Sequence, residues 1–375
     1  MNRRTNTAKW EENSKRWKIH VQKDNVRKSF YSSTPGRTGQ REAHAKADAW
    51  LDKNMVDTKK KVSYTIEKHI EQLKLTTSKS NWGQAEYYFR NYITPKIGEV
   101  RIENVTEQQL QNLINEAYAK GLAEKTLKGL RACIQSWLKF CRKSKFTTLF
   151  VEELTIPKNA PVGVKKILQP DDVRLLFSKD KIVYKRKEMV DLYVHAYRFQ
   201  VAMGLRPGEL VGLKKSDILH GTTVHVQRSF NIHDEETGGK NFNANRLIEL
   251  TDVADNILAE HFAMLAEDGI ESEFIFPDMY GERLREQTYY RRWQKFAQQN
   301  GITAITPYEM RHSFVSIVKT LPEGLLKSVV GHAKNMDTFG VYSHEMVGER
   351  VTTAKMINEI FVGILAKNTE RNVSK

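Results

Sequence analysis

Cysteine is nearly absent from this chain of 375 residues, which has only Cys133 and Cys141. The two lie eight residues apart in an amphipathic helical pattern, which favours buried thiols over a disulfide and indicates a reducing compartment. The sequence also lacks an HExxH motif, a pair of CxxC motifs and a regular triad of acidic residues. We therefore expect no metal site and no other cofactor.

Long apolar runs are missing as well. The first residues, MNRRTNTAKWEENSKR, contain no apolar segment, and no later stretch approaches the length that spans a membrane. We expect a cytoplasmic protein without a membrane partner. A chain of this length should form two or three domains.

Acidic residues are the minority charge, with 45 Asp and Glu against 60 Lys and Arg, so the net charge is +15. Residues 1–60 contribute +8 of this excess. A polyanion such as nucleic acid releases counterions when it binds a basic protein. A merely solvated tail would have the same composition, so charge alone favours DNA binding only modestly.

Four residues in the second half of the chain carry a more specific signal. Arg206 lies in GLRPGEL, Arg311 in YEMRHSF, His332 in VVGHA and Tyr342 in FGVYSH. Displacement at phosphorus builds negative charge on phosphate oxygens, which guanidinium groups can hold bidentately. A phenol that attacks phosphorus forms a covalent phosphotyrosine and preserves the bond energy for a second transfer. The set indicates attack on a phosphodiester without metal or nucleotide.

These motifs resemble those of the tyrosine recombinases, the family of phage and conjugative-element integrases. In GLRPGEL, Arg206 resembles the first catalytic arginine of the family and Glu209 its supporting acid. Arg311, His332 and Tyr342 match later motifs, with ten residues from the histidine to the tyrosine. The resemblance covers most of the chain and is strongest from about residue 169 onward.

Two further positions, Lys240 and Tyr308, bear on the resemblance. Lys240 lies eight residues before Ile248, the spacing of the hairpin lysine in the family. Where the family has His-x-x-Arg, this chain has Tyr308 followed by Arg311. A phenol can donate a hydrogen bond to phosphate, but it cannot act as a base near neutral pH as imidazole can.

The resemblance implies a site-specific recombinase that integrates and excises a mobile element through a 3′-phosphotyrosine intermediate. It implies a homotetramer on double-stranded DNA with core and arm-type sites, in the cytoplasm of a bacterium and acting at the nucleoid. An excisionase and a DNA-bending protein are candidate partners. The implied roles are phosphate binding by Arg206 and Arg311, hydrogen bonding by His332 and Tyr308, protonation of the leaving 5′ hydroxyl by Lys240, and attack by Tyr342.

Each residue also has a plainer interpretation. Arg206 could serve only as a salt-bridge partner of Glu209, Lys240 could be an ordinary exposed turn residue, and His332 could be a core histidine. We expect His312 to point away from the helix face that Tyr308 and Arg311 share, as a packing residue.

The expected fold is multidomain α+β. A small N-terminal three-stranded sheet plus helix would form an arm-type DNA-binding domain over residues 1–61. A helical core-binding bundle would span residues 62–157 and a linker residues 158–169. Residues 170–375 would form a mainly helical catalytic domain with a small β-sheet.

Basic residues in three of these regions are candidates for DNA contact, although an ordinary solvated surface would look the same. They are Lys18, Lys23, Arg27, Lys28 and Arg37 near the N-terminus, Lys125, Lys128 and Arg131 in the bundle, and Lys165 and Lys166 in the linker.

Local patterns predict several elements of the catalytic region. They include an apolar helix over residues 189–203 that ends at Gly204, and a helix that starts at Pro207 just after Arg206. Residues 224–230 and 246–250 flank a polar turn as the two arms of a hairpin, and Thr306 to Glu309 form a capping box. A one-sided helix over residues 351–365 would pack either on its own domain or on a neighbouring protomer.

Three other functions compete with recombination. A topoisomerase would use nearly the same residues, but the N-terminal basic module argues against it. A non-enzymatic DNA-binding regulator would explain the charge and leave the four motifs as coincidence. A metal-dependent transposase would need carboxylates that are not found.

Overall fold

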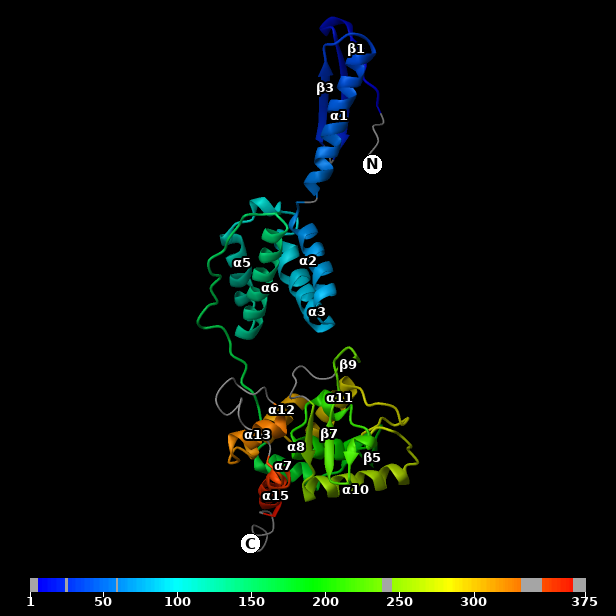
Figure 1. Cartoon of the computed structure of the whole chain (residues 1–375), viewed down its shortest axis with the longest axis vertical. Helices are drawn as coiled ribbons and strands as arrows, with labels where there is room; N and C mark the ends of the chain where they lie inside the picture. The colour runs from blue at the N-terminus through cyan, green and yellow to red at the C-terminus, as the bar shows by residue number, and fades with distance from the viewer. Residues whose placement is uncertain (1–5, 24–25, 59, 238–244, 332–345, 367–375) are drawn as a thin grey trace. The chain divides into compact units, whose positions relative to one another are not determined.

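The computed structural model of the chain describes residues 6–23, 26–58, 60–237, 245–331 and 346–366. The chain divides into two compact units, Met1–Gly163 and Val164–Lys375 (Figure 1). Helices predominate, and the sheets are small and antiparallel, so the α+β fold class is confirmed. Within the described ranges, no helix is long and apolar enough to cross a membrane.

The chain begins with a three-stranded sheet in the order β1-β2-β3 and one helix. Alternate residues of β2, Ile19 and Val21, are buried against α1 together with Ala43 and Ala47. The two alanines are four apart on one face of the helix, and their small side chains allow it to lie close along the sheet (Figure 1). The elements are β1 Lys9–Glu11, β2 Arg16–Lys23, β3 Val26–Ser32 and α1 Gly36–Thr58.

A helical bundle follows in the same unit. Its core contains Trp137, whose indole N–H donates to Thr65 Oγ1 at 3.1 Å. Cys133 and Cys141 are free buried thiols, as expected, and burial raises their pKa to about 12 and about 11. The helices are α2 Val62–Thr76, α3 Lys79–Tyr88, a π-helical turn Phe89–Ile93, α4 Thr94–Ile97, α5 Glu107–Ala119 and α6 Glu124–Lys143.

The second unit is built around α8, all of whose residues are buried. This helix packs against α10 and α12. Its elements are α7 Pro170–Ser178, β4 Lys181–Tyr184, β5 Lys187–Val190, α8 Val194–Met203, α9 Pro207–Leu210, β6 Ile218–Leu219, β7 Thr223–Val226, β8 Ser229–Phe230, β9 Glu236–Thr237, β10 Arg246–Glu249, α10 Asp252–Glu267, α11 Glu286–Gln299, α12 Pro307–Ile317, α13 Glu323–Val330 and α15 Glu349–Ala366. The largest sheet of this unit has the order β10-β7-β6.

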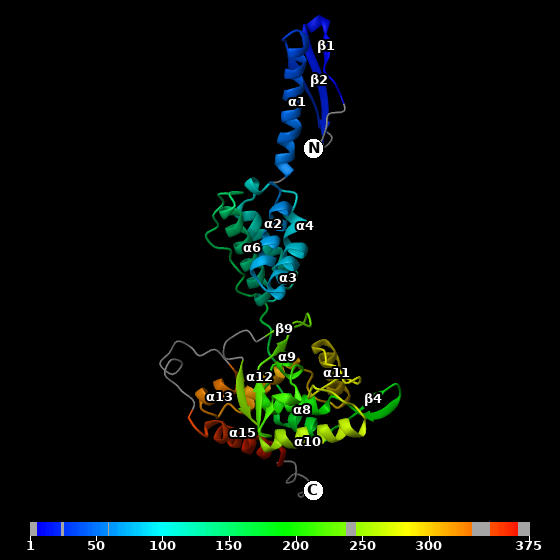
Figure 2. The same ribbon diagram turned by 45° about the vertical axis from the view of Figure 1, so that its right-hand side comes forward.

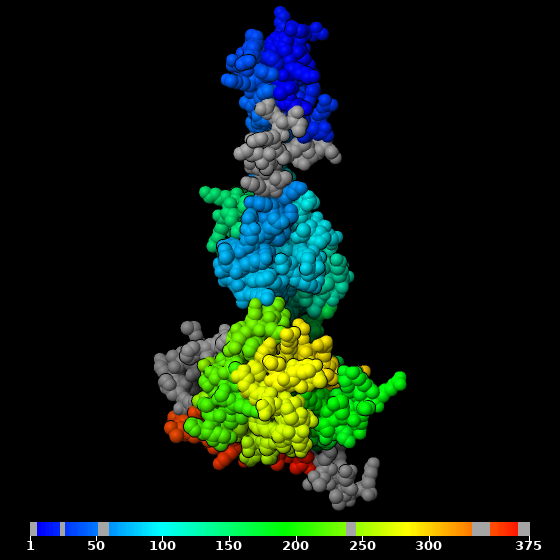
Figure 3. Space-filling view, turned by 90° about the vertical axis from the view of Figure 1, so that its right-hand side faces the viewer, coloured from blue at the N-terminus to red at the C-terminus, as the bar shows by residue number. Residues whose placement is uncertain are grey.

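The predicted helix over residues 189–203 is wrong in its first part. Met189 pairs with Ile182 in the β4–β5 hairpin, which projects from this unit (Figures 2 and 3). The helix begins only at Val194, because the Asp191 carboxylate accepts from the backbone N–H of Tyr193 at 3.1 Å and shapes the turn that leads into it. An apolar run therefore covers both an exposed strand and a buried helix, which periodicity alone does not separate.

The predicted hairpin of residues 224–230 and 246–250 is confirmed where β10 pairs with β7, but residues 224–230 do not form one continuous strand. β7 belongs to the larger sheet, and β8 pairs with β9. Between them, the Arg228 guanidinium forms an ion pair with the buried Asp217 carboxylate. This tertiary contact redirects the chain at a point where the sequence shows a continuous strand pattern.

The last helix, α15, packs on its own unit. Arg174 of α7 donates to Ile364 O at 3.1 Å, and Asn358 binds Val253 N and Asp252 at the start of α10. The Phe361 ring stacks on Phe314, with ring centroids 6.4 Å apart.

Candidate active site

Arg206 is positioned by the turn between α8 and α9. Gly204 ends α8 at φ 64°, a conformation that favours glycine, and a Cβ there would collide with the Phe314 ring. Arg206 is the N-cap of α9, and Pro207 is its first helical residue, as predicted. The Arg206 N–H donates to Glu209 Oε2 at 2.9 Å, which fixes the backbone at this position.

Arg311 is positioned by the capping box of α12. Thr306 Oγ1 accepts from Glu309 N at 3.2 Å, and the Glu309 carboxylate accepts from Thr306 N at 2.8 Å, so the predicted box is confirmed. Arg311 follows in the second turn and is 2% exposed. Its guanidinium donates to Gly204 O at 2.9 Å and also to Val330 O.

Three arginines from distant parts of the sequence meet at the C-terminal end of α13. Arg246 Nε donates to Val329 O at 2.7 Å, Arg311 Nη2 donates to Val330 O, and Arg206 Nη2 donates to Gly331 O at 3.1 Å. The last carbonyls of a helix have no partner within it and carry partial negative charge, so cationic donors stabilise them. The end of α13 thus gathers guanidinium groups from the N-cap of α9, from α12 and from β10.

Glu209 joins two of these arginines. Its Oε1 accepts from Arg206 Nη1 at 2.6 Å, and Arg246 donates to both carboxylate oxygens at 3.1 and 2.9 Å. Burial alone would raise the pKa of Glu209, but hydrogen bonding and charge from Arg246, together with Arg206, lower it to about 2. Glu209 is therefore ionised at neutral pH.

The four side chains together carry an excess of positive charge, since three guanidinium groups face one carboxylate. Burial, followed by the charge of Arg206, lowers the pKa of Arg311 to about 10, so it remains protonated at neutral pH. A largely buried group that has two positive charges in excess, and that reaches solvent at Arg206, is suited to bind an anion. We name these four residues, Arg206, Glu209, Arg246 and Arg311, the arginine cluster.

Arg246 was missed by the sequence interpretation, although Arg206, Glu209 and Arg311 were identified. It lies in RLIEL, at the start of the strand that follows the Lys240 region. The signal that could have found it is an arginine at a position of β10 where alternation predicts a buried residue. Isolated charges are rarely buried unless they are paired.

Tyr308 lies on the exposed side of α12, and its environment corrects one expectation. Its ring packs edge-on against His312, with centroids 5.2 Å apart, so His312 does not point away from Tyr308. Residues four apart on a helix are neighbours, and here the aromatic pair forms. Burial, then the charges of Lys165 and Arg311, lower the pKa of His312.

The two lysines predicted in the linker lie beside the same helix. Lys166 N donates to Glu309 Oε1 at 3.1 Å, and both lysines are exposed. Lys165 is close enough to act electrostatically on His312. The structure therefore brings these exposed cations to the N-terminal end of α12.

Three predicted site residues, Lys240, His332 and Tyr342, lie outside the described residues. Their roles stay predictions.

Basic residues of the N-terminal sheet are divided between its two faces. Lys18 lies on the face away from α1, because it alternates with buried Ile19, and it forms an ion pair with Glu11 at 2.9 Å. Arg27 lies on the same face. Lys28 lies on the α1 side, where its ammonium is 5.9 Å from the centroid of the Trp50 ring.

The other candidates for DNA contact are mostly exposed. Arg37 is exposed in the first turn of α1, and the side chain of Lys23 lies outside the described residues. On α6, Lys125 is exposed and Lys128 pairs with Glu124 at 2.7 Å. Arg131 donates to Leu154 O at 3.3 Å.

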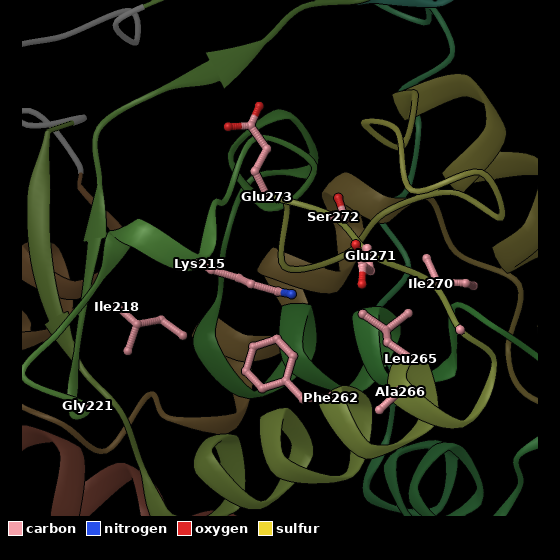
Figure 4. A pocket seen from close by; sticks show the side chains of 11 residues that line it. Lys215, Ile218, Gly221, Phe262, Leu265, Ala266, Ile270, Glu271, Ser272 and Glu273 are labelled. Carbon is pink, nitrogen blue, oxygen red and sulfur yellow. The ribbon is translucent and has the colours of Figure 1, made fainter.

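A separate groove of about 1250 Å³ lies beside α10 (Figure 4). Lys215 extends over the Phe262 ring, with its ammonium 5.7 Å from the ring centroid. None of the predicted site residues lines this groove. Among the described residues, no group of three or more His, Cys, Asp or Glu side chains could hold a metal ion.

Two models of known protein families match the chain. The model of the phage integrase family matches residues 166–348, and that of the phage integrase N-terminal SAM-like domain matches residues 61–118. The chain belongs to the tyrosine recombinase family. It is therefore an enzyme, a tyrosine-type site-specific recombinase.

Two curated tyrosine recombinases illustrate the similarity. A XerC-like tyrosine recombinase of Caldanaerobacter subterraneus subsp. tengcongensis is 22% identical, over 90% of this chain and 93% of its own length. The tyrosine recombinase XerD of Listeria monocytogenes is 29% identical, over 51% of this chain and 62% of its own length.

Solved structures of integrases share the fold. The Tn1549 transposon integrase in complex with transposon right end DNA has a TM-score of 0.58 at 16% identity, covering 77% of this chain and 97% of its own. The lambda integrase tetramer bound to a Holliday junction also has a TM-score of 0.58, at 14% identity, covering 92% of this chain and 100% of its own.

Proposed function

We propose that this recombinase integrates and excises a mobile element by cutting and rejoining DNA through a 3′-phosphotyrosine intermediate. The Tyr342 oxygen attacks the scissile phosphorus, and the bond from phosphorus to the 5′ oxygen breaks. The 5′ hydroxyl of a partner strand then attacks the phosphotyrosine and releases Tyr342. One phosphoester bond replaces another at each step, so the reaction needs no nucleotide and no metal.

The observation that carries this proposal is the convergence of Arg206 and Arg311 on adjacent carbonyls at the end of α13. The two arginines are 105 residues apart in the sequence, and each is fixed by hydrogen bonds to backbone oxygens. Fixed cationic donors stabilise the charge that develops on phosphate oxygens in the transition state. His332 directly follows the last of these carbonyls in the sequence.

The remaining roles follow the family pattern. We assign phosphate hydrogen bonds to His332 and to Tyr308, whose ring is half exposed on α12. Lys240 protonates the leaving 5′ oxygen as general acid. Glu209 holds Arg206 through its side chain and its backbone N–H.

The proposed partner is double-stranded DNA bound by four copies of this chain. The net charge of +15 and the exposed cations of the N-terminal sheet, α6 and the linker support DNA binding. Residues 1–61 would bind arm-type sites, residues 62–157 the core site, and residues 170–375 would carry out the chemistry, with residues 158–169 as the linker. An excisionase and a DNA-bending protein remain proposed partners.

The test needs a DNA probe that does not presuppose the attachment site. A duplex is first selected from a random-sequence pool by binding to the full wild-type chain, and versions with one nick at successive positions are then prepared. A nick near the scissile phosphate lets the leaving fragment diffuse away and traps the covalent adduct. We expect a denaturing gel to show an adduct with wild-type protein in the presence of a chelator, and peptide mapping to place it on Tyr342.

Tyr342→Phe should bind the selected duplex as the wild type does and form no adduct. Tyr290→Phe is a matched control, because Tyr290 is an exposed tyrosine of α11 with no assigned role. Adduct of unchanged yield with Tyr342→Phe, or a modified residue elsewhere, would contradict the assignment. Relaxation of a supercoiled plasmid without any pairing of two selected sites would instead indicate a topoisomerase.

A further inference from the structure

The guanidinium group of Arg246 donates more hydrogen bonds at this site than the guanidinium group of Arg206 or of Arg311. One guanidinium group donates to Val329 O at 2.7 Å and to both oxygens of Glu209 at 3.1 and 2.9 Å. Its side chain is 6% exposed, whereas that of Arg206 is 26% exposed. Arg246 therefore faces the interior, and Arg206 is the member of the pair that faces solvent.

The contact with Glu209 affects the charge that Arg206 can offer. Glu209 is 3% exposed and ionised, and it lies between the two guanidinium groups. With Arg246 present, the arginine cluster has three cations and one anion. Without it, a single buried carboxylate would be neutralised by Arg206 alone, because buried charges interact strongly at low effective dielectric. The positive charge left for a phosphate would then be smaller.

The contact of Arg246 with Val329 affects the position of the end of α13. Val329, Val330 and Gly331 present successive carbonyls to Arg246, Arg311 and Arg206. Loss of the first contact leaves one helix-end carbonyl unpaired and frees the end of α13 to move. Arg311 and Arg206 donate to the next two carbonyls, so their guanidinium groups would then be held less firmly.

We propose that Arg246 is a positioning residue of the recombination reaction: it neutralises Glu209 and holds the end of α13, so that Arg206 and Arg311 present their charge to the scissile phosphate. This inference rests on the proposed function. Arg246 does not touch the DNA itself. It acts through Glu209 and through the backbone of α13.

The experiment measures covalent adduct formation by the full chain on the nicked selected duplex, in a single turnover and over a range of duplex concentrations. Arg246→Met should lower the rate at saturating duplex by roughly 10- to 100-fold, as when a group that orients an active residue is lost. The duplex concentration at half saturation should change little, because Arg246 has no proposed DNA contact.

Charge compensation predicts a partial rescue. Replacing Glu209 by Gln in the Arg246→Met background removes the carboxylate that would neutralise Arg206, and the amide oxygen still accepts its hydrogen bond. The double variant should therefore cleave several-fold faster than Arg246→Met. A purely structural role of Arg246 predicts recovery of thermal stability at most, with no faster cleavage per folded molecule.

Arg198→Met is the matched control. Arg198 is also buried in this unit and donates to two carbonyls, Leu176 O at 3.0 Å and Lys179 O at 2.9 Å, but it contacts no member of the arginine cluster. It should lose stability without losing cleavage rate per folded molecule. If Arg246→Met does not fold, Arg246→Lys replaces it, and several-fold slower cleavage is expected because one ammonium cannot reproduce all three contacts.

The outcomes separate this inference from the proposed function. Absence of an adduct with wild-type protein on every nicked duplex would contradict the proposed function. A wild-type adduct that Arg206→Met abolishes but Arg246→Met leaves unchanged would overturn only the role of Arg246. Equal rates for Arg246→Met and the double variant would also overturn it.

Discussion

The first unit and the arginine cluster of the second unit carry positive charge in opposite ways. In the first unit, cations such as Lys18 and Lys128 are partly or fully exposed and pair with a nearby acid, Glu11 or Glu124. In the second unit, Arg311 and Arg246 are buried and held by backbone carbonyls and Glu209. Exposed ion pairs contribute little energy and adapt easily, whereas a buried guanidinium group needs every partner in place.

The contrast suggests a division of labour. Adaptable surface cations suit contact with a long, uniform polyanion, where each charge matters little. Fixed buried cations suit a single phosphate, because the direction in which their N–H groups point decides how well they stabilise the transition state. Substitutions should therefore have large, local effects in the arginine cluster and small, additive effects in the first unit.

Arg311→Met should give the largest effect. Arg311 is proposed to hold the reacting phosphate, and removing one such fixed donor typically lowers the rate by about 10²–10³-fold. The substitution also removes the donor to Gly204 O and Val330 O. Single-turnover adduct formation on the nicked duplex measures the loss. Binding of the duplex should fall far less, since other cations remain. A loss of less than about threefold would contradict the fixed-donor interpretation.

Two buried histidines should give an intermediate effect, on the stability of the second unit as the pH is lowered. His195 and His261 lie against each other in the core, with ring centroids 5.6 Å apart. Burial lowers the pKa of both from 6.5 to about 4, and the charge of Arg198 adds to this at His195. They are neutral in the folded protein, whereas the unfolded chain takes up protons below pH 6.5. The contribution of the two neutral histidines to the free energy of unfolding is therefore fully present above pH 6.5, and it is lost as the pH falls from 6.5 toward 4.

At pH 5 the loss should be about 2 kcal/mol for each histidine, since one pKa unit corresponds to ~1.4 kcal/mol. Hydrogen exchange of peptides from α8 and α10, corrected for intrinsic exchange, measures it between pH 7.5 and pH 5. The double variant His195→Gln, His261→Gln should lack this pH dependence. The same slope in both proteins would show that other groups cause it.

The smallest effect is expected in the first unit. Lys128→Gln should change the free energy of unfolding by less than about 0.5 kcal/mol, because its pair with Glu124 is exposed. If Lys128 contacts a phosphate, the salt dependence of DNA binding should decrease by about one unit of slope. Lys68→Gln is the matched control, since Lys68 pairs with Glu71 on α2 and is not among the predicted DNA contacts. Equal slopes for the two variants would exclude the contact.

Sequence patterns worked best where the cause is local. The capping box at Thr306, the left-handed Gly204 at the end of α8 and Pro207 after Arg206 depend on neighbouring residues, and all three were predicted. They failed where one apolar run served two elements, as at residues 189–203. The packing of His312 against Tyr308 differs from the prediction, because residues four apart on a helix are neighbours and these two rings meet.

The sequence by itself determined the chemical groups that are available, two arginines, a histidine and a tyrosine in spaced motifs, and the resemblance to the family to which the chain belongs. Only the tertiary structure decided how the arginines are held. Arg206, Arg246 and Arg311 lie far apart along the chain, and the carbonyls that align them belong to the end of α13. Every residue has a backbone carbonyl, so a sequence does not show which of them will accept hydrogen bonds from the arginines. Only the folded chain brings these groups together.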